Sequence, residues 1–351
     1  MNCSDLGVIG RKVGARRVAA RSMASPGCGR RIGAAGVGLV LALAIGFLLP
    51  GGASAQKRKA EYELKIATVA PEGSTWMNVM AELDAQIRER TQGQVGLRFY
   101  PGGIQGDDPV VLRKIRTGQL HGGGFTGVGL GEIVPNVRVM ETPFFFNSQE
   151  EVAAVHQVMD PVFEEQFRAK GFTLLGWAEV GFVYLYSKSP VASLADLRGR
   201  KVWLWEGDPL AEAFLRAVGV SAVSLALSDV LTSLQTGLLT TVYISPLACL
   251  AMQWHTRTAY VTDIPVTHSL GAVIVTNEAW GKIPEAQRPV VRELCREYFG
   301  RLAQLTAEDN RKAAEEIVKA GLKTVAPPPA EIEQFHAIGE KVRADLAGKL
   351  Y

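Results

Sequence analysis

The sequence predicts an α/β protein of two lobes, with a cleft between them and a long helix that braces both. Three observations support this fold class. The 351 residues suffice for roughly two domains. Segments typical of strands and helices alternate along the chain. Residues 284–320 form one amphipathic stretch whose only internal glycine is Gly300. A helix of that length would span more than about 50 Å, longer than one lobe.

The first strands and helices follow residue 61. Residues 62–69 alternate apolar and polar side chains and predict a strand. Ser74 is a suitable N-cap for an amphipathic helix over 75–90. Residues 95–100 predict a second strand, and 109–117 a helix that Gly118 ends. This order predicts a lobe with a largely parallel sheet.

A second series of alternating helices and strands begins near residue 191. The expected elements are a short helix at 193–197, strands at 201–205 and 241–244, helices at 208–218 and 228–236, and a strand at 272–276 that returns the chain to the first lobe. We therefore expect 62–185 and 269–310 to form the first lobe, 186–268 the second, and 311–351 a helical segment packing across them. A cleft between such lobes is the usual place for a small-molecule site.

The N-terminal segment has the organisation of a secretory signal peptide. Arg30 and Arg31 precede an uncharged apolar run over 32–49, and Ala53, Ser54 and Ala55 provide a small-residue cleavage site. We expect residues 1–55 to be this signal, and a periplasmic protein after cleavage. The alternative is a retained membrane anchor, since 18 apolar residues approach the length that crosses a bilayer.

Charge and composition narrow the class of protein. A 47% hydrophobic, 21% charged chain is not mainly disordered, collagen-like or disulfide-stapled. Seven of the 38 basic residues but only one of the 35 acidic residues lie in the first 55 positions, so the other 296 residues carry a net charge of −3. The basic excess therefore belongs to the leader, and we expect no nucleic-acid partner. Outside the leader only Cys249 and Cys295 remain, and Cys295 is expected to be a buried apolar residue.

Motifs for cofactors, metals and hydrolysis are weak in this sequence. The glycines of 122–127 fit the letters G-x-G-x-x-G, but 116–121 is not the apolar strand that a dinucleotide site requires. We expect these glycines to let the backbone approach the cleft closely. The five histidines lack zinc-site spacing, and Glu206 and Asp208 are expected as turn or helix N-terminal acids. We therefore predict neither a cofactor nor a metal.

The aromatic residues suggest an apolar cleft. Trp203 and Trp205 lie two apart in one predicted strand and so point to the same face. Ordinary core packing is the alternative for any one of the aromatics. Others that we expect to join the two tryptophans are Trp177, Phe182, Tyr184 and Phe144 to Phe146.

Eight segments in order resemble the extracytoplasmic solute-binding proteins of tripartite ATP-independent periplasmic (TRAP) transporters, the DctP-like family. They are LKIATVAPEGSTW (64–76), FYPGGIQGDD (99–108), RTGQL (116–120), ETPFFF (141–146), LLGWAEVGF (174–182), SLADLRGRKVW (193–203), LSDVLTSLQTG (227–237) and the long helix. The resemblance implies a type II-like periplasmic-binding-protein fold, delivery of a small molecule to TRAP permease subunits, and no catalysis.

The family's carboxylate clamp is missing from this sequence. The family commonly places an arginine just after the segment that ends here at Val202, where this chain has Trp203. A second arginine often follows the Gly-Phe pair, and here Val183 follows it. An asparagine often precedes the later proline, where this chain has Ser245. Such an arginine-less site resembles the TRAP branch with tetratricopeptide-repeat (TPR) lipoprotein partners.

Energetics then favour an apolar ligand. A charge-assisted hydrogen bond contributes about 1.5 to 3 kcal/mol, whereas a carboxylate buried without a partner costs several kcal/mol. Burial of eight methylenes would contribute roughly 6 kcal/mol before the costs of association. We therefore predict a hydrophobic or amphipathic ligand such as a fatty acid, another lipid or an aromatic compound. The expected ligand-binding residues are Trp76, Phe125, Phe144, Phe145, Trp177, Glu179, Phe182, Val183, Tyr184, Trp203, Trp205, Leu227, Tyr243 and Ser245.

Two other functions stay open at this point. The protein would bind an ordinary organic acid if Arg98, Arg138 or another cation replaced the missing clamp. It would instead be an exported enzyme if acid-base residues met in the cleft, the candidates being His121, Glu141, Glu179 and Glu206.

Overall fold

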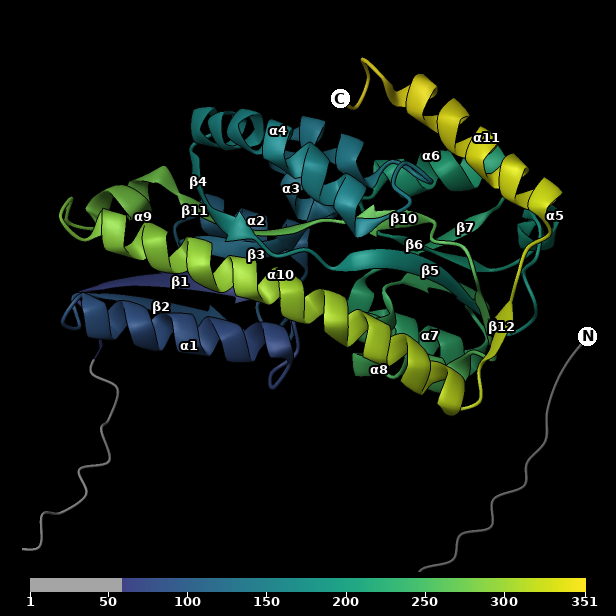
Figure 1. The fold of residues 1–351 in the computed structure, drawn as a ribbon, viewed down its shortest axis with the longest axis horizontal. Coiled ribbons are helices and arrows are strands. Elements are labelled where there is room, and N and C mark those ends of the chain that lie inside the picture. The colour runs from purple at the N-terminus through teal and green to yellow at the C-terminus, as the bar shows by residue number, and fades with distance from the viewer. Residues whose placement is uncertain (1–58) are drawn as a thin grey trace, which may run out of the picture. The chain divides into compact units, whose positions relative to one another are not determined.

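The computed structural model describes residues 59–351, which form two α/β lobes (Figure 1). The predicted signal peptide, 1–55, lies outside the described residues. We call the five-stranded sheet with its helices the first lobe, and the seven-stranded sheet with its helices the second lobe. Within 59–351, no helix has the length and apolar character needed to cross a membrane.

The sheet of the first lobe is mixed rather than largely parallel. Its order is β2-β1-β3-β11-β4. Strand β1 is parallel to β2 and β3, but β11 is antiparallel to β3 and β4 because it enters from the second lobe. The bounds are β1 (Tyr62–Thr68), β2 (Val95–Tyr100), β3 (Gly122–Thr126), β4 (Phe172–Trp177) and β11 (Gly271–Thr276).

The helices of the first lobe follow local capping signals. Ser74 accepts a hydrogen bond from Met77 N and starts α1 where the sequence predicts it. Asp107 caps α2 by accepting from the N–H of Asp108. The elements are α1 (Thr75–Arg90), α2 (Asp108–Arg116), α3 (Gly127–Ile133), the 3-10 helix η1 (Pro135–Glu141), α4 (Gln149–Ala169) and α9 (Asn277–Lys282).

Strand β3 was not predicted. Its residues GGGFT include three glycines, which carry no side chains to mark a strand, yet it lies at the centre of the first sheet. A Cβ at Gly122 would lie 2.2 Å from the Ile274 carbonyl oxygen, and one at Gly124 would lie 3.0 Å from the Trp76 ring. These glycines therefore let β11 and Trp76 approach the strand closely.

The second lobe contains a seven-stranded sheet in the order β12-β9-β5-β8-β6-β7, with β10 beside β5. Its strands are β5 (Gly181–Ser187), β6 (Val202–Trp205), β7 (Ala222–Leu225), β8 (Thr241–Ile244), β9 (Tyr260–Thr262), β10 (Thr267–Ser269) and β12 (Lys323–Val325). Its helices are α5 (Leu194–Leu197), α6 (Pro209–Val218), η2 (Leu227–Asp229), α7 (Val230–Thr236), α8 (Pro246–Ala251), η3 (Trp254–Arg257) and α11 (Pro329–Leu346). Helix α11 packs against α6 and α5.

The chain passes between the lobes at two short segments. Residues 178–180 join β4 to β5, and Leu270 joins β10 to β11. The first crossing thus precedes β5, so 181–185 belong to the second sheet and not, as expected from the sequence, to the first lobe. Gly181 begins β5 at φ +99°, and the side-chain amide of Asn310 donates to the Val180 carbonyl at 3.0 Å.

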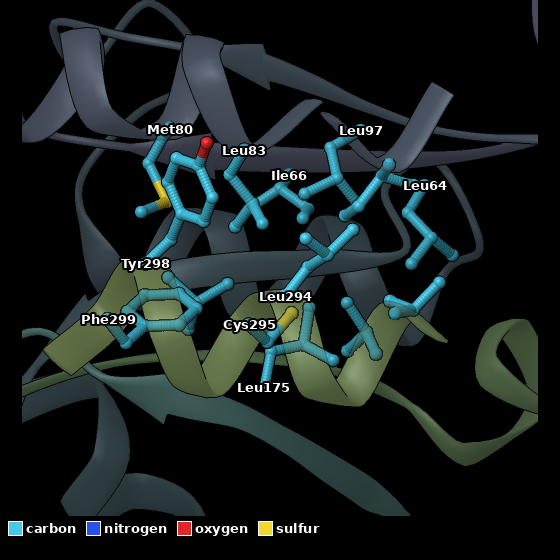
Figure 2. Packing of buried hydrophobic residues seen from close by; sticks show 14 of the residues in the cluster. Leu64, Ile66, Met80, Leu83, Leu97, Leu175, Leu294, Cys295, Tyr298 and Phe299 are labelled. Carbon is cyan, nitrogen blue, oxygen red and sulfur yellow. The ribbon is translucent and has the colours of Figure 1, made fainter. Parts of the chain in front are cut away.

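Helix α10 (Arg288–Lys319) braces both lobes, as predicted. Its 32 residues span about 48 Å, and it packs on α1 and β4 in the first lobe and on α8 in the second. In Figure 2, Leu294, Cys295, Tyr298 and Phe299 face a core that includes Leu83. Cys295 is buried there, as the sequence predicts.

Candidate functional site

A cavity of about 440 Å³ lies between the lobes and draws its walls from both. Its size falls within the range of small-molecule pockets, and its lining is mainly apolar. Trp76 and Phe125 come from the first lobe, while Leu185, Trp203 and Phe214 come from the second.

Stacked aromatic rings form one wall of the cavity. Strand β6 places Trp203 and Trp205 on the same face, as predicted, with ring centroids 5.6 Å apart. Trp203 stacks on Tyr243 at 5.0 Å and meets the edge of Trp254 at 5.3 Å. Its indole N–H donates to the Leu225 carbonyl at 3.0 Å, so its polar atom is satisfied within the second lobe.

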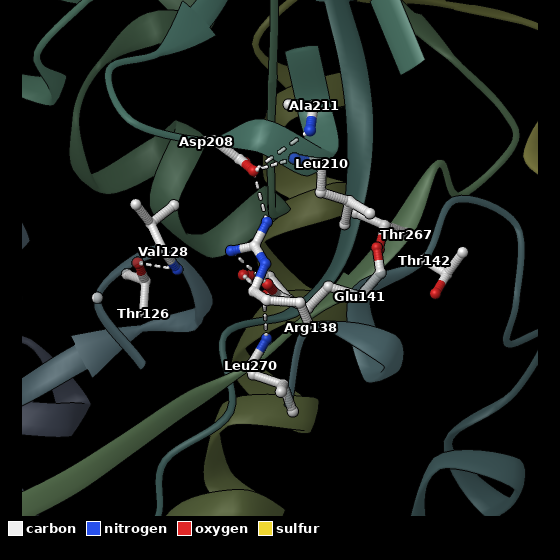
Figure 3. A network of polar contacts seen from close by, with 12 residues as sticks. Thr126, Val128, Arg138, Glu141, Thr142, Asp208, Leu210, Ala211, Thr267 and Leu270 are labelled. Atoms are coloured by element: carbon white, nitrogen blue, oxygen red, sulfur yellow. Dashed lines mark hydrogen bonds and ion pairs between the residues drawn. The ribbon is translucent and has the colours of Figure 1, made fainter. Parts of the chain in front are cut away.

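An arginine with two carboxylates forms a polar centre in this apolar cavity (Figure 3). Arg138 Nη1 lies 2.9 Å from Glu141 Oε2, and Arg138 Nη2 lies 2.6 Å from Asp208 Oδ1. The Arg138 side chain is only 3% exposed. Its Nε has no hydrogen-bond partner among the described residues. We call these three residues the Arg138 triad.

Both carboxylates of the triad are also held by backbone donors. Asp208 caps α6, and its Oδ1 accepts from Leu210 N at 3.0 Å and Ala211 N at 3.2 Å. Glu141 Oε1 accepts from Leu270 N at 2.7 Å. These bonds fix the carboxylates, and the carboxylates in turn fix the guanidinium.

The electrostatics of the triad preserve the positive charge on the arginine. Burial opposes that charge, but Asp208 and Glu141 outweigh it and raise the pKa of Arg138. Burial raises the pKa of Glu141, although Arg138 acts against this shift. Among the described residues that line the cavity, Arg138 is the sole lysine or arginine. Its two terminal nitrogens already face protein carboxylates.

A second buried charge cluster surrounds Glu179, which lines the cavity. Its carboxylate accepts from Gln149 Nε2 at 2.8 Å and lies 3.1 Å from His156 Nε2 and 3.4 Å from His268 Nε2. Burial opposes the charge of His156, but Asp160 and Glu179 raise its pKa to about 9. Burial likewise opposes the charge of Glu179, but the two histidines lower its pKa. Glu179 is therefore held as a carboxylate by its neighbours.

The structure brings nine of the fourteen expected residues to the cavity. They are Trp76, Phe125, Glu179, Val183, Trp203, Trp205, Leu227, Tyr243 and Ser245.

The other five expected residues lie outside the cavity lining. In β5, alternate residues face opposite sides, so Val183 and Leu185 line the cavity while Phe182 and Tyr184 do not. Phe182 instead packs on His268, with centroids 5.1 Å apart.

The remaining three expected aromatics occupy other parts of the lobes. Trp177 packs against Phe163 and Phe167 in the first lobe. Phe144 lies in the core of the second lobe, 5.6 Å from the Phe335 ring. Phe145 is 36% exposed.

Three residues of the alternative functions also lie outside the cavity lining. Arg98 is 3.9 Å from Glu63 and largely exposed. His121 Nδ1 accepts a hydrogen bond from Lys65 N. Glu206 is exposed. Within 59–351, no group of three or more histidine, cysteine or acidic side chains has an arrangement that would hold a metal.

The full role of Asp208 was not predicted from the sequence. An acid at a turn or helix start was expected, and the residue is indeed an N-cap, but its side chain also reaches a buried arginine 70 positions away. The available signal was the pair Arg138 and Glu141, spaced by three and the only charged residues between Glu132 and Glu150.

Comparisons with known proteins agree with this architecture. A TRAP periplasmic solute-binding protein from Haemophilus influenzae with bound L-gulonate superimposes with a TM-score of 0.77 at 17% identity, covering 82% of this chain and 94% of that one. One from Desulfovibrio salexigens with bound orotic acid gives a TM-score of 0.76 at 19% identity, covering 82% and 93%. These likenesses establish the two-lobed fold.

Curated relatives are similar over part of their length. The uncharacterized protein YiiZ of Salmonella typhimurium is 30% identical over 164 residues, which is 45% of this chain and 49% of YiiZ. A solute-binding protein of Chromohalobacter salexigens is 25% identical over 244 residues, or 68% of this chain and 71% of that protein. The chain thus spans about half of the first relative and more than two thirds of the second.

The family model for bacterial extracellular solute-binding protein family 7 matches residues 66–349, nearly all of the described chain. Its members bind solutes, which excludes the exported enzyme considered above. The chain belongs to this family, DctP, the bacterial extracellular solute-binding proteins of family 7.

Proposed function

We propose that this protein is the exported receptor of a TRAP transporter and that it captures a hydrophobic or amphipathic ligand between its lobes. Family membership and the two-lobed fold support the transport role. The observation that carries the ligand class is the Arg138 triad, because the cation lining the cavity already faces two carboxylates of the protein. A ligand carboxylate would have to displace one of them.

The apolar walls of the cavity favour the binding of an apolar ligand. Trp203, Trp205 and Phe214 offer ring faces and edges, and burying each ligand methylene against such a wall contributes about 0.8 kcal/mol. Val183 and Trp203, where the family commonly has arginines, both line the cavity. A ligand with a long apolar portion therefore gains more here than a small acid does.

An organic acid is the second candidate ligand. It is favoured by the structural relatives, which hold L-gulonate and orotic acid. For this chain it would require Arg138 to exchange Asp208 or Glu141 for the ligand.

Native mass spectrometry of the protein purified from its own host would separate the two candidates. We expect a bound apolar or amphipathic compound, which organic solvent extracts. The stripped protein should give no binding heat with L-gulonate or orotate in calorimetry. Recovery of a small polar acid, or tight binding of either acid, would overturn the proposed ligand class.

The partners follow from the same proposal. We expect delivery to TRAP permease subunits, export by the leader at 1–55, and docking to a TPR-repeat lipoprotein. Affinity purification from membranes of the native host checks the partners, and N-terminal sequencing of the secreted chain checks cleavage. Recovery of the permease without the lipoprotein would support the transport role and contradict the proposed TPR partner.

A further inference from the structure

We infer that Asp208 is a specificity-determining residue. Its carboxylate pairs with Arg138 and so keeps the carboxylate of an organic acid from binding that arginine. This inference rests on the proposed function and extends it by naming the residue that excludes acids. It also assigns that residue a second task, because its bond to Arg138 joins the two lobes.

The bond crosses between the lobes inside the cavity. Arg138 belongs to η1 of the first lobe, and Asp208 caps α6 of the second. Arg138 Nη2 and Asp208 Oδ1 are 2.6 Å apart, with side chains 3% and 9% exposed. Both residues line the cavity, so a bound ligand and this ion pair share one space.

The two carboxylates of the triad differ in how lobe movement affects them. Glu141 lies three residues after Arg138 in the same 3-10 helix, so their contact survives any separation of the lobes. Asp208 is supplied by the other lobe, so its contact forms only when the lobes are together. When the lobes close, the carboxylate of Asp208 therefore pairs with the terminal nitrogen of Arg138 that Glu141 leaves open.

Asp208 has an advantage over any free acid. Its carboxylate is delivered by the fold and is oriented by the N–H groups of Leu210 and Ala211, so it loses little freedom on meeting Arg138. A ligand carboxylate placed near Nη2 would meet Asp208 and Glu141 as like charges. The triad therefore repels acids as well as occupying their site.

Asp107 provides a matched control. It is also a helix N-cap whose carboxylate bonds across the lobes, accepting from Trp205 Nε1 at 3.0 Å and Leu227 N at 3.3 Å. It is not part of the Arg138 triad. Replacing it with serine removes the interlobe bonds and keeps an N-cap, without releasing the guanidinium of Arg138.

The experiment compares wild type, Asp208→Ser and Asp107→Ser by calorimetry, after solvent extraction of bound compounds. Serine keeps N-cap capacity in both variants. The probes are L-gulonate and the neutral aromatic N-phenyl-1-naphthylamine. We expect Asp208→Ser to bind L-gulonate at least about tenfold more tightly than wild type, since one charge-assisted bond becomes available. Asp107→Ser should gain less than about twofold, and adding Arg138→Gln to Asp208→Ser should abolish the gain.

The outcomes separate this inference from the proposed function. If Asp208→Ser gains nothing while wild type binds the neutral probe, the role of Asp208 is wrong and the apolar ligand class stands. Equal gains in Asp107→Ser would show that loosening the lobes, not freeing Arg138, admits the acid. Tight binding of L-gulonate by wild type would overturn the proposed ligand class itself. If Asp208→Ser fails to fold, Asp208→Asn, which keeps size and cap acceptor but not charge, must show the gain.

Discussion

The indole N–H of Trp205 donates a 3.0 Å hydrogen bond to the carboxylate of Asp107. Trp205 lies in β6 of the second lobe, and Asp107 caps α2 of the first. The same oxygen accepts from Leu227 N, so two donors of the second lobe bind one oxygen of the first. The aromatic wall of the cavity is thereby tied to the opposite lobe.

Replacing Trp205 by phenylalanine should weaken ligand retention more than fold stability. The change keeps an aromatic ring but removes the donor to Asp107, a charge-assisted bond of about 1.5 to 3 kcal/mol. We expect calorimetry with N-phenyl-1-naphthylamine to show about ten- to 150-fold weaker binding. Unchanged affinity would mean that the bond does not contribute to the bound state.

Trp203→Phe is the companion variant, with a different expected outcome. Trp203 is 1% exposed and donates to Leu225 within its own lobe. Losing that bond and part of the ring should lower the free energy of unfolding by about 1 to 3 kcal/mol. Urea unfolding followed by far-ultraviolet circular dichroism measures this loss. A normal unfolding free energy would contradict the structural role assigned to its indole N–H.

The charge cluster at Glu179 predicts how stability changes with pH. The pKa of His156 rises from 6.5 to about 9 in the folded state, so its stabilising contribution is complete below pH 6.5 and is lost as pH rises towards 9. Glu179, with a lowered pKa, stays charged throughout this window. Gln149, Asp160 and His268 are the other polar neighbours of the pair.

His156→Gln should therefore flatten the fall in stability between pH 6.5 and 9. Thermal unfolding across that range measures the slope. His121→Gln is the control, because burial lowers the pKa of His121 and moves its effect to the acid side of pH 6.5. A wild-type slope in His156→Gln would contradict the assignment.

The crossing into β5 predicts a position where alanine is poorly tolerated. Gly181 has φ +99°, and a Cβ there would lie 2.8 Å from Asn310 Nδ2. Gly199 has φ +77° with no atom within 4 Å of its Cβ position. We expect Gly199→Ala to cost about 1 to 2 kcal/mol from backbone strain alone.

Gly181→Ala should cost more than Gly199→Ala because it also displaces the Asn310 amide from Val180 and Leu247. Paired urea titrations give the difference. Equal losses would show that the Asn310 contacts contribute little to joining α10 with the crossing.

Local sequence signals predicted much of the fold. Ser74 and the apolar periodicity after it locate α1, and the spacing of Trp203 and Trp205 places both on the cavity face. Strand β3 escaped because glycines carry no side-chain pattern. Phe182 and Tyr184 were grouped with Val183 although strand alternation separates them.

The polar centre of the site was harder to predict than its walls. The bond between Arg138 and Asp208 joins residues 70 positions apart, and no local pattern encodes a pairing between two lobes. Arg138 was considered only as a ligand's partner. The structure instead gives it partners from the protein, which changes what the cavity is expected to accept.

The clustering of indole rings gives this receptor a built-in optical reporter. Trp76, Trp203 and Trp205 line the cavity, and Trp254 touches Trp203. Four of the six tryptophans therefore line or adjoin the cavity where a ligand would bind. Trp177 and Trp280 lie in the interior of the first lobe. Changes in emission intensity on titration should come chiefly from the occupied cavity, so candidate compounds can be screened against the unlabelled protein.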